Sequence, residues 1–361
     1  MVKGDRLEIK DISNILLIQL GDIGDVVLTL PSIRALREHF PQGNIVVAVR
    51  EKAKELIEGC PWASGVISIN QDKRRLSQEI IYQKRFFSHV RKFRFDLAID
   101  MRRGTRGAIL AYLSAARQRV GFYASKGAFW RNRLFSHLAS SERRPDQYMA
   151  QFYLSLLEKY GLGTENICPE INISPDKQEK AVELFRKEKV PLDRPVIALQ
   201  PFSLWEYKEW GIEKYAQLIN WIWSEYQLPI IIIGSFDERG RAEEIIKKCG
   251  GKVFNFAGKT SLGMLSAVLK LCGLFIGIDS AGIHIAAAVG IPTVSIFGPG
   301  LFNIWAPKGK KHRVVRKDFP CVPCDKKGCY GSEISKCLVE LTLDEVKDVV
   351  RCQIDKIINN V

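Results

Sequence analysis

The chain alternates, twice over, between short apolar runs and amphipathic helical stretches, and this alternation constrains its fold more than any other feature. The apolar runs cover residues 15–20, 45–49, 66–69, 97–100 and 119–122, and then 196–200, 229–233, 253–255, 274–278 and 293–297. The helical stretches between them cover 32–39, 52–58, 105–115, 146–160, 212–225, 238–248, 261–271 and 281–289. Because such alternation is typical of parallel sheets with crossover helices, the sequence predicts two doubly wound α/β domains.

The length of the chain supports this division. Its 361 residues exceed what one hydrophobic core usually holds. We predict an N-terminal α/β domain over residues 1–168 and a C-terminal α/β domain over 169–361. The Gly- and Pro-rich segment 161–195 is the expected linker, and a Cys-rich segment at 321–337 and a helix at 343–358 close the second domain.

Positive charge is concentrated in one part of the chain. The formal net charge is +14, and residues 71–145 hold 18 Lys and Arg against 5 Asp and Glu, a local excess of +13. Such an excess indicates an anionic partner. A phosphorylated or carboxylated substrate, nucleic acid, an anionic membrane surface and a merely solvated basic face all remain open at this point.

The sequence gives three indications of compartment. The first ten residues lack the apolar region of a signal peptide. Nine cysteines, an odd number, indicate a reducing environment. The uncharged stretch 280–301 is long enough to resemble a membrane span, but Gly290, Pro292 and Pro299 interrupt it and favour a short helix followed by a buried strand. We therefore expect a cytoplasmic protein.

The first motif follows the first predicted strand directly and contains Gly21, Asp22, Gly24 and Asp25. Glycines at a strand-to-helix turn allow a ligand to approach the backbone. The spacing is not Gly-x-Gly-x-x-Gly, which excludes the dinucleotide fingerprint. A carboxylate in such a turn either caps the helix or faces a ligand, and the residues alone leave both roles open.

Two further motifs follow strands of the second half. Ser203 and Lys208 come after the first of these strands and could hold a phosphate, or could be an exposed polar turn beside an aromatic hinge. Asp279 and Ser280 precede a helix that begins with small residues, whose backbone N–H groups form an anion site. His284 in its first turn is either part of that site or a core histidine.

The sequence lacks two motifs of nucleotide- and metal-binding enzymes. The tripeptide Gly258-Lys259-Thr260 imitates the end of a P-loop, but Val253 occupies the position of the required first glycine. No Asp-x-Asp occurs in the chain, which disfavours a transferase that uses Mg²⁺ held by such a pair.

Four thiols lie close together near the end of the chain, namely Cys321, Cys324, Cys329 and Cys337. Four thiolates can hold a tetrahedral Zn²⁺, and Cys-x₂-Cys is the usual first half of such a site. The second spacing is irregular. A structural zinc site and a set of free or redox-sensitive thiols are both compatible with this pattern.

Together these motifs resemble glycosyltransferase family 9, the ADP-heptose–lipopolysaccharide heptosyltransferases. The resemblance covers nearly the whole chain and rests on residues 17–31, 256–262, 279–288 and 292–299. It implies a GT-B-like α/β fold, in which two doubly wound Rossmann-like domains face a central cleft. It also implies that the N-terminal domain holds the acceptor and the C-terminal domain the nucleotide-sugar, and that the reaction inverts configuration without a bound metal.

The resemblance also implies roles for particular residues. Asp25 matches the catalytic base, and Lys208 the lysine at the donor phosphates. The implied donor-binding residues are Ser203, Lys208, Asp237, Thr260, Asp279, Ser280, Ala281 and His284. The implied acceptor-binding residues are Asp22, Gly24, Arg102 and Arg103. Glu238 is the alternative to Asp237 as the ribose contact, and Ala281 stands where many members have glycine.

The implied function is transfer of a heptose from ADP-heptose to the Kdo/heptose inner core of lipopolysaccharide. The expected partners are an ADP-sugar donor, an anionic lipid-linked saccharide acceptor and the inner face of the cytoplasmic membrane, with no nucleic acid. We expect no cofactor for catalysis. The four cysteines could hold a structural zinc, with free or redox-sensitive thiols as the alternative. The alternative is another GT-B nucleotide-sugar transferase or epimerase with a different donor.

Overall fold

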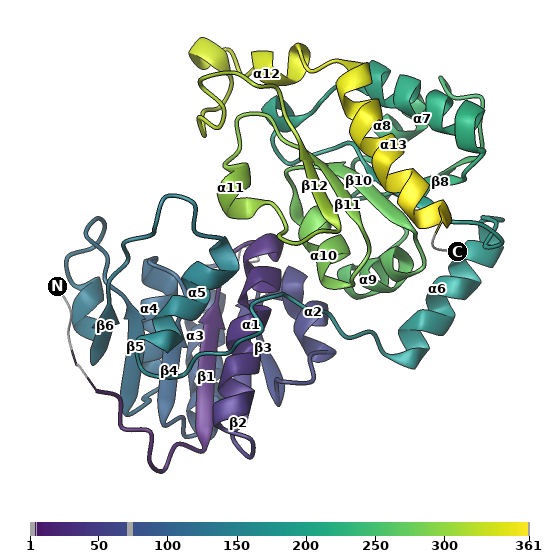
Figure 1. The fold of residues 1–361 in the computed structure, drawn as a ribbon. Helices are drawn as coiled ribbons and strands as arrows, with labels where there is room; N and C mark the ends of the chain where they lie inside the picture. Colours follow the sequence, from purple (N-terminus) through teal and green to yellow (C-terminus); the bar gives the residue numbers. More distant parts are fainter. Residues whose placement is uncertain (1–3, 5, 71–74, 360–361) are drawn as a thin grey trace. The chain divides into compact units, whose positions relative to one another are not determined.

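The computed structural model describes residues 4, 6–70 and 75–359 of the chain (Figure 1). The chain divides into two compact units, Met1–Asn172 and Ile173–Val361. The division falls after residue 172 rather than at the expected 168. Each unit is described by itself below.

A six-stranded parallel sheet forms the centre of the first unit. Its strands are β1 (Asn14–Gln19), β2 (Asn44–Arg50), β3 (Gly65–Ile69), β4 (Leu97–Asp100), β5 (Gln118–Phe122) and β6 (His137–Ala139), in the order β3-β2-β1-β4-β5-β6. The apolar run Ile15–Ile18 is fully buried in β1. Strands of a parallel sheet are covered on both faces by crossover helices, which explains why this run is continuous rather than alternating.

The helices of the first unit are α1 (Ile23–His39), α2 (Lys54–Glu58), α3 (Leu76–Lys92), α4 (Thr105–Leu113) and α5 (Met149–Glu158). Helix α1 packs against α5, whereas α3 and α4 contribute to one shared hydrophobic core with the sheet. Helix α1 begins at Ile23, within the first glycine motif, and not at residue 32, so Pro31 lies inside the helix.

The second unit repeats the strand order of the first. Its strands are β7 (Ile197–Gln200), β8 (Ile230–Ile232), β9 (Val253–Asn255), β10 (Leu274–Ile278), β11 (Thr293–Ile296) and β12 (His312–Val315), in the order β12-β11-β10-β7-β8-β9. Its helices are α6 (Pro175–Lys187), α7 (Ile212–Tyr226), α8 (Arg239–Ile246), α9 (Leu262–Lys270), α10 (Ala281–Ala288), α11 (Phe302–Trp305), α12 (Lys336–Val339) and α13 (Leu343–Asn359).

Most predicted elements are present, with two kinds of difference. All ten predicted strands occur, and two short edge strands, β6 and β12, were not predicted. The segment 161–195 is not simply a linker, because it contains α6, which packs against α9. The uncharged stretch 280–301 forms α10 and β11, as expected, and no helix within 6–70 and 75–359 is long and apolar enough to cross a membrane.

Each sheet has one switch point, a pair of neighbouring strands from which the strand order continues in opposite directions. In the first unit this point lies between β1 and β4, and in the second between β7 and β10. In open α/β sheets, ligands bind outside the carboxyl ends of the strands at such a switch point. The fold therefore directs attention to the residues that follow β1 and β4, and to those that follow β7 and β10.

Candidate active site

The turn after β1 brings Asp25 to the switch point of the first unit. Asp22 is the N-cap of α1, and its backbone N–H donates to Asp25 Oδ2 at 2.8 Å. A carboxylate in the first turn of a helix is stabilised by the positive end of the helix dipole. Of the two roles that the sequence left open for these carboxylates, Asp25 takes the capping role. A role toward a ligand stays a prediction.

Two side chains from other elements complete the surroundings of Asp25. Arg102, in the loop after β4, donates to Oδ2 at 2.5 Å, and Tyr153 of α5 donates its hydroxyl to Oδ1 at 2.5 Å. Asp25 is 8% exposed, whereas the Arg102 side chain is 42% exposed. The buried carboxylate therefore has an accessible guanidinium on one side and a buried phenol on the other.

Tyr153 acts toward Asp25 as a proton donor. Burial, followed by the nearby charge of Asp25, raises the pKa of the Tyr153 hydroxyl well above its ordinary value. The hydroxyl therefore stays protonated and keeps its hydrogen bond to the carboxylate. Such a bond to an ionised group is stronger than one between neutral groups.

Gly21 makes the close approach of Asp25 and Arg102 possible. A Cβ atom at this position would collide with Asp25 Oδ2 and with the Arg102 guanidinium. The structure therefore gives this glycine of the first motif a steric reason, because a side chain at position 21 would prevent the contact between Asp25 and Arg102.

The other predicted acceptor residues border Asp25 less closely. The exposed Asp22 carboxylate pairs with Arg50 at 3.0 Å and with Lys52 at 3.1 Å. Partial burial of Asp22 opposes its charge, but Lys52 and Arg50 outweigh that effect and hold its pKa below the ordinary value. Gly24 lies half-buried in the first turn of α1, and Arg103 is exposed beside Arg102.

A buried ion pair fixes the loop that carries Arg102. Asp100, at the end of β4, accepts the Arg102 backbone N–H at 3.1 Å and pairs with Arg131 at 3.3 Å. The Arg131 guanidinium also donates to the carbonyl oxygens of Arg102, Gly104 and Phe122. Both ion-pair partners are 1% exposed, and burial raises the pKa of Asp100 to about 7 against the pull of Arg131.

The second unit places an ion pair at the equivalent switch point. Lys208, in the loop after β7, lies 2.6 Å from Asp279 Oδ2, in the turn after β10. Their side chains are 22% and 11% exposed, so both reach the surface only in part. Of the residues predicted to bind the sugar donor, the structure thus brings Lys208 and Asp279 together.

Helix α10 begins directly after this pair. Ser280 is its N-cap with extended backbone, and its side chain makes no capping hydrogen bond within the described part of the chain. Ala281 is the first helical residue, and His284 is buried in the first turn with its ring 6.5 Å from that of Trp305. The first-turn N–H groups of this helix, beside an ammonium group, suit an anion.

Gln200 also approaches the start of α10. Its side chain reaches Gly282 so closely that a Cβ there would collide with its Oε1. That oxygen is buried without a hydrogen-bond partner among the residues that the structure describes. Sequence reasoning missed Gln200, because a glutamine at the end of an apolar strand carries no motif.

A second ion pair orders the loop that carries Ser203 and Lys208. Glu209 pairs with Arg241 of α8, and its Oε1 accepts the Ser203 backbone N–H at 3.0 Å. Ser203 in turn accepts the Trp205 N–H through its hydroxyl at 3.2 Å. The Ser203 hydroxyl therefore stabilises its own turn.

The remaining donor candidates lie on the next two loops of the same sheet edge. Asp237 is exposed in the loop after β8, where Glu238 accepts the Ser235 N–H at 2.6 Å. Thr260 is half-buried in the loop after β9. Lys259, the residue of the false P-loop, pairs with Glu188 at 2.6 Å, which gives it a structural partner.

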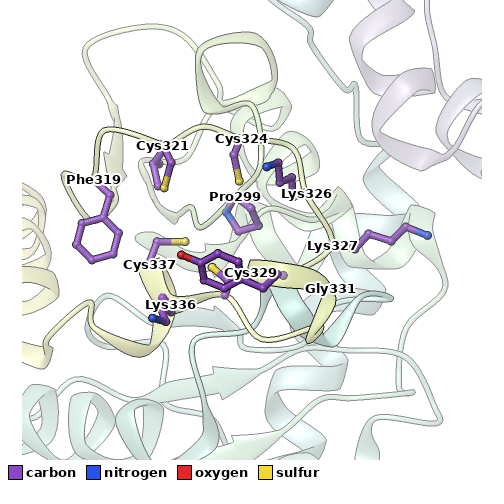
Figure 2. Close-up of a pocket in the computed structure, with 14 residues that line it drawn as sticks. Pro299, Phe319, Cys321, Cys324, Lys326, Lys327, Cys329, Gly331, Lys336 and Cys337 are labelled. Atoms are coloured by element: carbon purple, nitrogen blue, oxygen red, sulfur yellow. The ribbon is translucent and has the colours of Figure 1, made fainter.

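The four predicted metal ligands line one cavity of about 570 Å³ in the second unit (Figure 2). Burial, followed by the charges of Cys329 and Cys324, raises the pKa of Cys337 to about 11. Among the described residues, however, no three His, Cys, Asp or Glu side chains are arranged as metal ligands. The thiols share a cavity but do not form a closed metal site.

The cysteine-rich segment, residues 321–337, contacts the loops at the switch point. Ser335 donates its hydroxyl to the Tyr207 carbonyl at 2.6 Å, and Lys327 lies 4.9 Å from the centre of the Trp205 ring. The Asp325 N–H donates to the Pro299 carbonyl at 2.8 Å. The segment therefore contacts the loop after β7 and the turn after β11.

A family model and the similar sequences both point to the same family of known proteins. The model of glycosyltransferase family 9, the heptosyltransferases, matches residues 83–334. Lipopolysaccharide heptosyltransferase 3 of Escherichia coli is 26% identical over 289 residues, which cover 79% of this chain and 83% of the relative.

Solved structures agree on the fold. The ADP-heptose lipopolysaccharide heptosyltransferase II of E. coli superposes with a TM-score of 0.78 at 19% identity, covering 95% of this chain and 99% of the other. An iron-containing dodecameric glycosyltransferase of enterotoxigenic E. coli, TibC, superposes with a TM-score of 0.58 at 15% identity, covering 97% and 78%. The two doubly wound α/β domains expected from the sequence are thus confirmed.

Proposed function

The chain belongs to glycosyltransferase family 9, the heptosyltransferases, and on that premise we propose that it transfers a heptose from ADP-heptose to the anionic inner core of lipopolysaccharide. We further propose that the reaction inverts the anomeric configuration and that Asp25 is its general base. The proposal rests on one observation. The two units carry different sites at equivalent switch points: the Asp25 carboxylate in the first unit, and in the second the Lys208 ammonium beside a helix start that suits an anion.

The surroundings of Asp25 suit a base. An ionised carboxylate offers about four lone-pair sites. The Asp22 N–H and Arg102 occupy those of Oδ2, and Tyr153 occupies one on Oδ1. One site on Oδ1 remains open among the described residues, and it can receive the proton of an acceptor hydroxyl.

The reaction then follows from the two sites. The acceptor oxygen forms a bond to the anomeric carbon from the face opposite the diphosphate, and its proton passes to Asp25 Oδ1. The bond between that carbon and the phosphate oxygen breaks, and its electron pair leaves with ADP. A positioned base of this kind accelerates the reaction by roughly 10²–10⁴-fold.

Lys208 and the start of α10 would neutralise the leaving diphosphate. In the structure the Lys208 ammonium is held by Asp279, which positions it beside the helix that Ser280 caps. A fixed ammonium and oriented backbone N–H groups stabilise developing negative charge without reorganising. We propose that these groups, rather than a bound metal, carry out this step. Asp237 and Thr260, on the neighbouring loops, are the proposed contacts to the adenosine.

Arg102 and Arg103 would receive the acceptor. Arg102 is half-exposed over Asp25, and Arg103 is exposed beside it. Guanidinium groups bind carboxylate and phosphate groups through two parallel hydrogen bonds. An inner core rich in such groups fits this loop, and its lipid anchor would place the protein at the inner face of the cytoplasmic membrane.

The four cysteines carry a separate proposal, a structural metal. Their common cavity supports it, and the TibC structure contains iron, but the thiols as arranged do not form a closed site. Binding would therefore require residues 321–337 to draw the thiols together. Metal content of the purified protein tests this, with replacement of Cys321 and Cys324 by serine expected to abolish any bound zinc or iron. Stoichiometric metal in that variant would contradict the proposal.

The donor is tested by thermal unfolding with ADP, UDP, GDP and CMP, each in EDTA. We expect a rise in the unfolding temperature with ADP alone, because a ligand that binds only the folded state stabilises it. A selective rise with UDP or GDP would contradict the ADP-heptose donor. It would instead favour the alternative function, another nucleotide-sugar transferase or an epimerase of the same fold.

A further inference from the structure

Helix α3 is unusually exposed for a helix that connects two strands of a sheet. It has 17 residues, and only Val90 is buried. Phe86, Phe87 and Phe93 are half-buried and pack on the core of the first unit. With Val90, these residues form the part of α3 that packs on the core, and much of the remaining surface of the helix faces solvent.

The solvent-facing side of α3 begins with aliphatic residues. Leu76, Ile80 and Ile81 are 78%, 60% and 53% exposed. The later turns present exposed cations, namely Lys84, Arg85, Arg91 and Lys92. Glu79, the acidic residue of this helix, is half-buried and accepts a hydrogen bond from Gln83 at 2.6 Å. The exposed residues of α3 thus include apolar, basic and neutral polar side chains and no carboxylate.

Helix α4 extends the same surface. Arg91 of α3 donates to the carbonyl of Leu113, at the end of α4, at 3.0 Å. Arg106, Ile109 and Tyr112 are exposed at a spacing of three residues, which places them on one face of α4. Ile109 and Tyr112 are 38% and 52% exposed.

Exposed acidic side chains are absent from a long stretch around α3 and α4, residues 75–119. Every residue from 75 to 119 is described, and those that are exposed include nine Lys or Arg and no Asp or Glu. We call the exposed residues of α3 and α4 the α3–α4 surface. Lys73 and Arg74, part of the basic segment noted in the sequence, lie outside the described residues.

We propose that the α3–α4 surface docks on an anionic lipid bilayer, with Leu76, Ile80 and Ile81 entering the headgroup region and the cations contacting lipid phosphates. An amphipathic helix with basic residues around an apolar face binds such interfaces. Large aliphatic side chains that face water mark an interaction site when they lie together. The proposal rests on the proposed function, because a lipid-linked acceptor is found only at a membrane.

The position of the surface supports this role. In a parallel sheet, each helix that follows a strand begins at the carboxyl edge. Helix α3 follows β3, and α4 follows β4, so Leu76, Ile80 and Arg106 lie toward the edge that carries Asp25 and Arg102. Docking there would bring that edge close to an acceptor anchored in the bilayer.

Nucleic acid fits this surface less well. Proteins that bind single strands combine cations with exposed aromatic rings on which bases stack. Between residues 75 and 119, the exposed aromatic rings are those of Tyr112 and His89. The Arg119 guanidinium lies 5.6 Å from the Tyr112 ring centre, and the His89 ring packs edge-on against Phe93. Exposed Leu76, Ile80 and Ile81 would gain nothing from a phosphate backbone, whereas a bilayer would remove them from water.

The experiment measures co-sedimentation of the full-length protein with vesicles of phosphatidylcholine alone, or with added phosphatidylglycerol. We expect binding to the anionic vesicles that weakens with salt. Lys84→Ala/Arg85→Ala should reduce the partition coefficient roughly 30-fold, about fivefold for each cation. Ile80→Ser/Ile81→Ser should reduce it about tenfold or more, because two apolar anchors are lost.

Two matched variants control for general effects. Arg186→Ala/Lys187→Ala removes the same charge from an exposed pair on α6, and Leu192→Ser/Ile358→Ser removes two exposed aliphatic residues elsewhere. Both should bind vesicles as the unmodified protein does. If they lose as much binding as the α3 variants, the surface is not specific and the proposal fails.

Other outcomes would also overturn the proposal. One is unchanged vesicle binding by both α3 variants. Another is tight binding of random single-stranded DNA that Ile80→Ser/Ile81→Ser leaves unaffected, together with no preference for anionic vesicles. Transfer to a water-soluble acceptor fragment separates this proposal from the proposed function. All variants should retain that activity, and its absence in the unmodified protein would count against the enzyme function while leaving vesicle binding as a separate result.

Discussion

The carboxylate of Asp25 shows how neighbouring residues prepare one side chain for chemistry. Arg102 and the Asp22 N–H saturate one oxygen, while Tyr153 leaves the other oxygen half-occupied. The two side-chain donors differ in exposure, since Tyr153 is buried and Arg102 is half-exposed. An incoming anionic acceptor can therefore contact Arg102 while Tyr153 continues to orient the base.

Replacement of Tyr153 by phenylalanine tests this orientation. We expect kcat to fall roughly 10- to 100-fold, which corresponds to one hydrogen bond to an ionised group. The donor KM should stay unchanged, because Tyr153 contacts Asp25 of the first unit and not the proposed donor site of the second. Tyr215→Phe, at a buried tyrosine of the second unit, is the matched control. Equal losses in both variants would mean a general effect on folding.

Asp100 predicts a pH dependence of stability. Its pKa is about 7 in the folded protein, above the ordinary 3.8, so the folded state holds the proton more tightly than the unfolded state. The stabilisation from this group is complete below about pH 4 and is lost as the pH rises through about 7.

Urea unfolding of the protein and of Asp100→Asn measures this effect. Between about pH 5 and about pH 8, the unfolding free energy of the unmodified protein should fall relative to that of the variant, which has no group to ionise there. A difference that stays constant or grows in favour of the unmodified protein would show that Arg131 keeps Asp100 ionised throughout.

The sequence indicated the proposed reactive residues more directly than the residues that support them. Asp25 and Lys208 stand in glycine- or serine-containing turns after apolar strands, which is a local signal. Tyr153 sits within an apolar helix and Arg131 within a basic segment, and nothing near either of them in sequence distinguishes them. Their roles depend on residues 128 and 31 positions away, to which only the folded sheet brings them.

At the scale of elements, the buried central strands were predictable, whereas two edge strands and the exposed helix α3 were not. Central strands such as β1 and β10 are buried on both faces, so their sequences are continuously apolar. The edge strands β6 and β12 have three and four residues and include His137, His312 and Arg313. Helix α3 was not predicted because its exposed aliphatic residues obscure the stripe of half-buried aromatic residues.

The start of α10 gives a prediction at this scale. Gly282→Ala should weaken ADP binding about tenfold, because the added Cβ collides with Gln200 Oε1 and displaces the first turn of the proposed anion site. Gly240→Ala, also near the start of a helix but with open space around the added atom, should leave ADP affinity unchanged. Calorimetric titration with ADP measures both. Unaltered affinity in Gly282→Ala would place the diphosphate elsewhere.

At the scale of the whole molecule, two units with no detected sequence repeat share one strand order. Each places an ion pair at its switch point, Asp25 with Arg102 and Lys208 with Asp279. The sequence predicted this common architecture because the strand–helix alternation repeats. The boundary lies after residue 172 rather than after 168, and α6 belongs to the second unit in both divisions.

The central claim is that the first unit supplies the base and the second unit binds the donor nucleotide. It is tested most directly by the rate of heptose transfer from ADP-heptose to a lipid-linked Kdo acceptor, measured for the protein and for Asp25→Asn together with the ADP affinity of each. We predict a kcat lower by roughly 10²–10⁴-fold in Asp25→Asn, with ADP affinity unchanged. A variant that retains the rate, or one that loses ADP binding instead, would contradict the account.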